Sequence, residues 1–138
     1  MRVVGVDLGT RRIGVAVSDA TGTLASPHVV LDRSGDPAAD HRRLAEIVVE
    51  TGAERVVVGL PLSLSGAAGP AARAAAEEAD ALAVVVGVPV ETFDERLTTV
   101  SAERALRAGG TRAPSRRKVI DKAAAAVMLQ AWLDGGRR

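Results

Sequence analysis

Short apolar runs, set in a fixed order among helical segments, are the feature that most constrains how this chain can fold. The first three runs lie close together, at residues 2–8, 13–18 and 23–31, and each is typical of a buried strand. The links between them are too short for a crossover connection, which needs a dozen or more residues. The start of the chain therefore predicts three strands in an antiparallel meander.

Helices and strands alternate through the rest of the sequence. The spacing predicts a helix at 38–51 that ends at Gly52, a strand at 55–59, a helix at 70–86, a strand at 88–93, and two helices at 99–108 and 115–133. Right-handed crossovers place strands one, four and five parallel, with strands two and three added antiparallel at one side. We expect one α/β domain over residues 1–138, with a mixed five-stranded sheet flanked by helices in the order βββαβαβαα.

Composition narrows the chemistry that the chain can carry. There is no cysteine, and the two histidines, His28 and His41, cannot build a structural zinc site, so any metal is expected to have oxygen ligands. No apolar run approaches the roughly 20 residues that a membrane helix needs, and the first residues lack a signal-peptide pattern. We expect a soluble, cytoplasmic protein with no membrane partner.

Charge is unevenly distributed along the chain. Residues 1–95 hold 8 basic and 14 acidic side chains, whereas residues 96–138 hold 10 basic and 3 acidic ones. Such asymmetry is typical of a polyanion-binding face, but 16 of the 18 basic residues are arginine, which is also typical of a biased composition. Charge alone leaves the two explanations equally open.

Two acidic residues stand where parallel strands of the predicted sheet end, the edge at which such sheets bind ligands. Asp7 interrupts the first apolar run, and a carboxylate buried there needs a cation or hydrogen-bond donors. Glu95 directly follows the fifth strand. Taken singly, Asp7 is equally well explained by N–H groups of the turn at 9–10, and Glu95 is better explained by an ion pair with Arg96. Their place at one end of the same sheet predicts instead that they converge.

Asp121 is a third carboxylate, in an unusual place. At about 100° per residue it shares a helix face with the stripe that is expected to meet the sheet, which comprises Ala124, Ala125, Met128 and Trp132. The alternative is an ion pair with Lys118 or Lys122, but these point about 60° and about 100° away. The inward position therefore favours a functional site.

Three carboxylates gathered at one sheet end repel each other and raise one another's pKa values unless cations lie between them. Two divalent cations about 3.5 to 4 Å apart can activate a water and stabilise the leaving oxygen of a phosphodiester, a hydrolysis that needs no histidine or cysteine. We therefore expect Asp7, Glu95 and Asp121 to be metal ligands and catalytic residues, with Mg²⁺ or Mn²⁺ as the cofactor.

Basic residues cluster where a helix gains no stability from them. The first turn of the last helix carries three cations, although the macrodipole disfavours positive charge there. This is typical of a phosphate-binding rim, with a solvated face as the alternative. The residues expected to bind nucleic acid are Arg11, Arg12, Arg96, Arg112, Arg116, Arg117 and Lys118. In addition, the composition of segment 59–66 suits a loop that passes close to a substrate backbone.

Four motifs in this order resemble the YqgF (RuvX) family of pre-16S rRNA nucleases, also described as Holliday junction resolvase-like. They are GVDLGTRRIGVAVSD at 5–19, VGLP at 58–61, DERLTT at 94–99 and KVIDKAAA at 118–125, and they run the length of the chain. The resemblance implies a ribonuclease H-like fold, metal-assisted phosphodiester cleavage and a role in maturing the 5′ end of small-subunit rRNA. Asp7, Glu95 and Asp121 match the acidic positions of the family.

Three other functions stay open at this point. A Holliday junction resolvase-like DNA endonuclease would use the same carboxylates. The opening DLGT at 7–10 followed by a meander also resembles the phosphate-binding start of actin-like ATPases and sugar kinases, but those proteins close two such lobes around ATP and this chain has one. A nucleic-acid-binding or ribosome-associated module without catalysis would keep the fold and the basic face.

The expected partner is nucleic acid, with precursor rRNA ahead of structured DNA, and ribosomal particles are a further expected partner. The chain is expected to act as a monomer or a homodimer.

Overall fold

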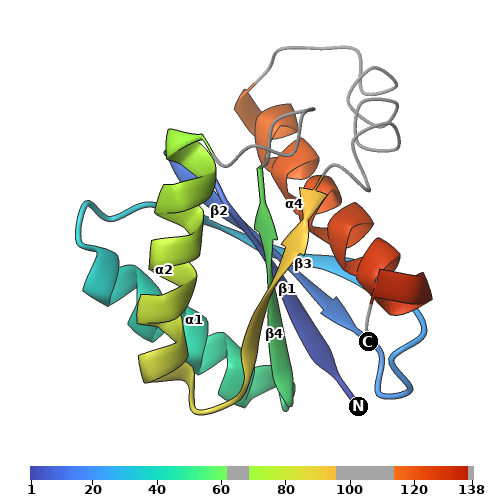
Figure 1. The fold of residues 1–138 in the computed structure, drawn as a ribbon. Helices are drawn as coiled ribbons and strands as arrows, with labels where there is room; N and C mark the ends of the chain where they lie inside the picture. Colours follow the sequence, from blue (N-terminus) through green and yellow to red (C-terminus); the bar gives the residue numbers. More distant parts are fainter. Residues whose placement is uncertain (62–68, 96–113, 137–138) are drawn as a thin grey trace.

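The computed structural model describes residues 1–61, 69–95 and 114–136, with the side chains of the last helix described from Ala123 onward. The strands within these residues are β1 (Val3–Leu8), β2 (Arg12–Ser18), β3 (Ala25–Asp32), β4 (Arg55–Leu60) and β5 (Val90–Asp94). They form one five-stranded sheet in the order β3-β2-β1-β4-β5 (Figure 1). β1, β4 and β5 are parallel, and β2 and β3 are added antiparallel beside β1. The predicted mixed sheet is confirmed.

Helices cover both faces of the sheet. α1 (Pro37–Thr51) and α2 (Pro70–Val86) lie on one face, and α4 (Pro114–Ala131), which passes into a short π-helical turn at Trp132–Gly136, lies on the other (Figure 1). α4 begins at the end of the molecule where β1, β4 and β5 finish. The predicted helix at 99–108 falls outside the described residues. No helix in the described ranges is long and apolar enough to cross a membrane.

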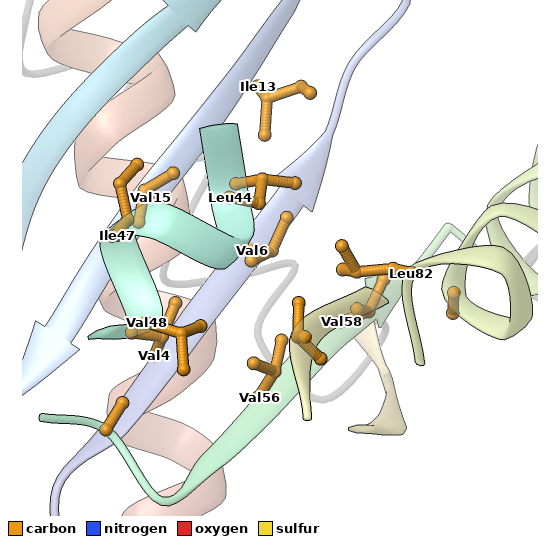
Figure 2. Packing of buried hydrophobic residues seen from close by; sticks show 13 residues of the cluster. Val4, Val6, Ile13, Val15, Leu44, Ile47, Val48, Val56, Val58 and Leu82 are labelled. Atoms are coloured by element: carbon orange, nitrogen blue, oxygen red, sulfur yellow. The ribbon is translucent and has the colours of Figure 1, made fainter. Parts of the chain in front are cut away.

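The larger core lies between the sheet and helices α1 and α2 (Figure 2). Alternate residues of the strands point into it, since neighbouring residues of a strand face opposite sides. The strand residues are Val4, Val6, Ile13, Val15, Val56 and Val58, and the helix residues that meet them include Leu44, Ile47, Val48 and Leu82. Full burial of each of these side chains contributes about 1.5 to 3 kcal/mol.

The second core lies between the sheet and α4. Val3, Val57 and Phe93 pack there against Met128, Leu129, Trp132 and neighbouring residues of the helix. The helix lies very close to β1, because a Cβ atom built at Gly5 would lie only 2.8 Å from the Cβ of Leu129. The absence of a side chain at Gly5 therefore sets how closely α4 approaches the sheet.

The structure decides where one helix ends, and it corrects the predicted start of one strand. The β-branched run at 84–86 leaves the end of the second helix ambiguous, yet α2 continues to Val86 and ends at Gly87, which has φ 67°. Val86 is buried while Val84 is 86% exposed, so a helical pattern of burial overrides strand propensity here. β3 begins at Ala25 rather than at the predicted residue 23, because the preceding residues close a turn in which the Asp19 carboxylate accepts the N–H of residue 23.

Candidate active site

Asp7 is the penultimate residue of β1 and lies on the face of the sheet that α4 covers. Val4 and Val6 point into the core under α1 and α2, whereas Val3 packs in the core under α4. Because successive residues of a strand alternate between faces, Asp7 shares the α4 side with Val3. The residue is half-buried and lies at the carboxyl end of its strand.

Glu95 follows β5 on the same face. A Cβ atom built at Gly59, two residues after Val57 of the core under α4, would lie 2.9 Å from Cγ of Glu95, so the Glu95 side chain lies on the same side. β4 separates β1 from β5 in the sheet. The carboxyl groups of Glu95 and Asp7 nevertheless meet and share a hydrogen bond. The structure thus brings together the two residues that the sequence predicts to converge.

The two carboxyl groups change each other's chemistry. The pKa of Glu95 is raised to about 8, first by burial and then by the charge of Asp7, the hydrogen bond to Asp7 and the charge of Asp94. Glu95 therefore keeps a proton at neutral pH when no cation is bound, and it can donate that proton to Asp7. Ionising both groups together requires positive charge nearby.

The Gly9 N–H, one of the alternative partners considered for Asp7, is bound elsewhere. The N–H of Gly9 donates to the backbone carbonyls of Asp7, at 3.2 Å, and of Arg12, at 3.0 Å. It therefore serves the turn rather than the carboxylate of Asp7. Arg96, the alternative partner of Glu95, lies outside the described residues.

Asp121 lies on α4, four residues before Ala125. The predicted inward stripe of this helix is confirmed from Ala125 onward, since Ala125, Met128 and Trp132 are at most 2% exposed. The side chain of Asp121 itself falls outside the described part of the helix. Its backbone belongs to the half of α4 that begins where the parallel strands end (Figure 1).

Among the predicted nucleic-acid-binding residues, Arg11 and Arg12 lie at the turn between β1 and β2. Arg11 is exposed and Arg12 is half-buried, and residues 9–12 line a shallow hollow close to the end of β1. Arg116, Arg117 and Lys118 lie near the start of α4, and their side chains fall outside the described part. Arg96 and Arg112 lie outside it altogether.

A charged network that the sequence did not predict braces the turn after β1. Arg33 donates two hydrogen bonds to the Glu78 carboxylate, with N···O distances of 2.6 and 3.0 Å, and His41 Nε2 lies 2.8 Å from the same carboxylate. Arg33 Nε also donates to the carbonyl of Gly9 at 3.0 Å. The network therefore ties α1 and α2 to the turn. Its sequence signal is a pair of polar residues, His41 and Glu78, on apolar helix faces.

Hydrogen bonds to both edges of the sheet fix α4 near its C-terminal end. The side chain of Gln130 accepts from the N–H of Ala25 at 2.9 Å and donates to the carbonyl of Thr23 at 2.9 Å. On the other side, Trp132 Nε1 donates to the Glu91 carboxylate at 3.1 Å. These contacts fix the helix that carries the third carboxylate against the sheet.

Comparison with known proteins identifies the family. The model of the family described as "RuvX: Holliday junction resolvase" matches residues 1–135. A protein of Leifsonia xyli subsp. xyli named "Putative pre-16S rRNA nuclease" is 53% identical over 134 residues, which cover 97% of this chain and 86% of the relative. A protein of the same name from Mycobacterium leprae is 54% identical over 134 residues, which cover 96% of this chain and 72% of the relative.

Solved structures share the fold. Thermus thermophilus RuvC aligns with a TM-score of 0.59 and 20% identity, covering 99% of this chain and 97% of RuvC. RuvC in complex with a Holliday junction substrate aligns with a TM-score of 0.60 and 21% identity over the same shares. At this identity the likeness shows the fold alone, which is ribonuclease H-like. Because the family model spans nearly the whole chain and the relatives are about half identical, the chain belongs to the RuvX (YqgF) family of nucleases.

Proposed function

We propose that this chain is a metal-dependent nuclease that hydrolyses phosphodiester bonds of nucleic acid, with precursor 16S rRNA as its substrate. The observation that carries the proposal is the carboxyl pair of Asp7 and Glu95 at the carboxyl edge of the parallel strands. The names of relatives that are 53% and 54% identical support the substrate class. The carboxyl pair supports metal-dependent hydrolysis as the reaction.

The donor set at this edge fits Mg²⁺ or Mn²⁺. Both groups are carboxyls, and hard oxygen ligands are those that these cations prefer. Burial and repulsion make the fully ionised pair costly, and a divalent cation would offset that cost. Where side chains are described, the chain holds no group of three or more possible ligands. The proposal therefore assigns the third ligand to Asp121, whose side chain falls outside that part.

In this proposal Asp7, Glu95 and Asp121 would hold the divalent cations, a pair of which would supply an activated water and charge stabilisation at the reacting phosphate. Glu95 gives up the proton that it shares with Asp7, so that both groups bind as carboxylates. The proposal assigns phosphates beside the cleaved bond to Arg11 and Arg12, and the hollow that residues 9–12 line after β1 supports this. Such contacts orient a nucleic acid backbone without reading its sequence.

A second candidate activity is cleavage of four-way DNA junctions. The family description, which names a Holliday junction resolvase, favours it. The same carboxylates and the same phosphate contacts would serve either substrate, because neither reads the sugar. Recognition of the 2′-hydroxyl is what would distinguish RNA from DNA.

Cleavage assays separate these possibilities. Labelled precursor 16S rRNA, a four-way DNA junction and a plain single strand are each incubated with the protein in EDTA, in Mg²⁺ and in Mn²⁺. We expect cation-dependent cleavage of the precursor rRNA in preference to the other two substrates. Preferred cleavage of the junction would favour the second candidate, and undiminished cleavage in EDTA would contradict the metal-dependent mechanism.

Variants of the three carboxylates test the assignment of the site. Asp7→Asn, Glu95→Gln and Asp121→Asn should each abolish cleavage while the circular dichroism spectrum stays unchanged. The matched control is Glu54→Gln, which should cleave like wild type. Glu54 is exposed and lies just before β4, at the opposite end of that strand from the carboxyl pair. Wild-type rates in Asp7→Asn would remove this residue from the site.

The basic residues at the start of α4 are tested by salt dependence. Replacing Arg116 and Arg117 together by alanine should weaken nucleic acid binding across sequences and flatten the dependence of log K on log salt by about one unit for each lost phosphate contact. An unchanged slope would mean that these two side chains form a solvated face.

A further inference from the structure

Gly59 occupies the middle strand of the candidate site. Val6 of β1 pairs with Val58 of β4, so Asp7 and Gly59 are the next residues of two neighbouring strands. On the other side of β4, Gly59 pairs with Phe93 of β5. Gly59 therefore lies between Asp7 and the end of β5.

Gly59 also faces α4, as both carboxyl groups do. Val56 and Val58 point into the core under α1 and α2, and Val57 packs in the core under α4, so alternation puts Gly59 on the α4 side. Neighbouring strands lie about 4.8 Å apart, which separates β1 from β5 by about 10 Å. Side chains from these two strands meet only by leaning over β4, and a side chain at position 59 would stand between them.

Glu95 fills the space that a side chain at position 59 would need. A Cβ atom built at Gly59 would lie 2.9 Å from Cγ and 3.0 Å from Cδ of Glu95, and closer still to its Oε1. An alanine at position 59 and the present position of the Glu95 carboxyl therefore exclude each other. The obstacle is the end of a flexible side chain rather than backbone, so β4 can accept an alanine if that carboxyl moves.

We propose that Gly59 is a positioning residue, whose missing side chain lets Glu95 lean across β4 to meet Asp7 and so sets the spacing of two ligands for one divalent cation. The inference rests on the proposed metal-dependent nuclease. It gives Gly59 a role through Glu95, in place of the contact with a substrate backbone that the sequence suggested for segment 59–66.

A double-mutant cycle on Mn²⁺ affinity tests this role. Binding is followed by the loss of the electron paramagnetic resonance signal of free Mn²⁺ in wild type, Gly59→Ala, Glu95→Ala and the double variant. In the wild-type background Gly59→Ala should weaken Mn²⁺ binding by about tenfold or more, the loss typical when the support of a ligand is removed. In the Glu95→Ala background it should weaken binding by less than about twofold, because the alanine acts only through Glu95.

Gly69→Ala controls for the change of glycine to alanine. Among the described residues, a Cβ atom at Gly69 would meet no atom within 4 Å, so this variant should bind Mn²⁺ like wild type. The positioning role would be overturned if Gly59→Ala weakened Mn²⁺ binding equally in the wild-type and Glu95→Ala backgrounds. It would also be overturned if the Gly59→Ala variant bound Mn²⁺ with wild-type affinity.

A crystal structure of the Gly59→Ala variant adds a readout that needs no metal. We expect the Glu95 carboxyl to have left Asp7, and a Glu95 that still contacts Asp7 would refute the inference. If wild type binds no Mn²⁺ but the variant shows Glu95 displaced, the proposed metal-dependent function fails while the steric role of Gly59 stands. The two ideas can therefore fail separately.

Discussion

Replacing Glu95 by glutamine measures how much the carboxyl pair lowers the free energy of unfolding. The pKa of Glu95 is raised from 4.5 to about 8, first by burial and then by Asp7. Between these values the folded chain keeps a proton that the unfolded chain has lost. The free energy of unfolding therefore falls as the pH rises from 4.5 to about 8, and then levels off. The Glu95→Gln variant lacks this ionisation and should lack this part of the pH dependence.

The magnitude follows from the pKa and from the exposure of the group. One pKa unit corresponds to about 1.36 kcal/mol, so the full shift would amount to about 5 kcal/mol. Glu95 is only half-buried, and screening by water reduces this to about 2 kcal/mol. Wild type and Glu95→Gln should be equally stable near pH 4.5, and the variant should be more stable by about 2 kcal/mol near pH 8.5, or about 5 °C in Tm.

Urea unfolding in EDTA, repeated across the pH range, is the assay. The fluorescence of Trp132 reports unfolding, because it is the only tryptophan of the chain and is 2% exposed in the folded state. Asp7→Asn keeps the burial of Glu95 but removes the neighbouring charge, so it should retain part of the slope. Glu54→Gln should follow wild type. Identical pH dependence in wild type and Glu95→Gln would refute this prediction, because the pKa of Glu95 would then not be raised in the folded chain.

Three further predictions test the packing, the charged network and the third ligand. Gly5→Ala should lower the free energy of unfolding by about 1 to 3 kcal/mol, because its Cβ would press on Leu129, and an unchanged Tm would contradict this. Glu78→Gln should cost about 2 kcal/mol at neutral pH by leaving Arg33 without its ion pair. Burial raises the pKa of Glu78, but hydrogen bonds from Arg33 and His41 outweigh it and lower the pKa below its ordinary value. The cost should therefore vanish in acid, as wild type loses the carboxylate, and thermal melts across the acid range measure this. Mg²⁺ at a hundred times its Kd should raise the free energy of unfolding of wild type by about 2.7 kcal/mol and that of Asp121→Asn by much less. Equal stabilisation of both proteins would show that Asp121 is not a metal ligand.

The topology of the sheet could be predicted because connection lengths leave few choices. Short links between the first three strands allow only hairpins, and helices between the later strands require crossovers, which are right-handed. The end of α2 could not be predicted in the same way. Val84 and Val86 have the same intrinsic preference for strands, and only packing in the folded chain buries the second and exposes the first.

The convergence of Asp7 and Glu95 could also be predicted, because parallel strands end at one edge of a sheet. The sequence does not reveal that β4 lies between them at the point of contact. It shows a glycine at position 59, but not which neighbour occupies the space above it. That neighbour is 36 residues further along the chain, and its position depends on the pairing of β4 with β5.

The reasoning that singled out Asp121 applies equally to His41 and Glu78, which are also polar residues on apolar helix faces. The structure pairs these two with each other and with Arg33. An inward polar residue therefore signals that a partner is needed, but the partner can be structural. The sequence cannot identify it, because His41 and Glu78 lie on different helices, 37 residues apart.

The turn after β1 also bears on the actin-like interpretation, in which this turn would hold the phosphates of ATP through its backbone. The N–H of Gly9 is bound to the carbonyls of Asp7 and Arg12. The carbonyls of Gly9 and Arg11 accept hydrogen bonds from Arg33, which Glu78 holds in place. The Gly9 N–H is therefore already engaged at this turn, whereas the side chain of Arg11 is exposed there. An exposed cationic side chain at the turn that follows the strand of Asp7 suits a nucleic acid backbone bound near a metal-assisted cleavage, and this favours the proposed nuclease over the ATP-binding module.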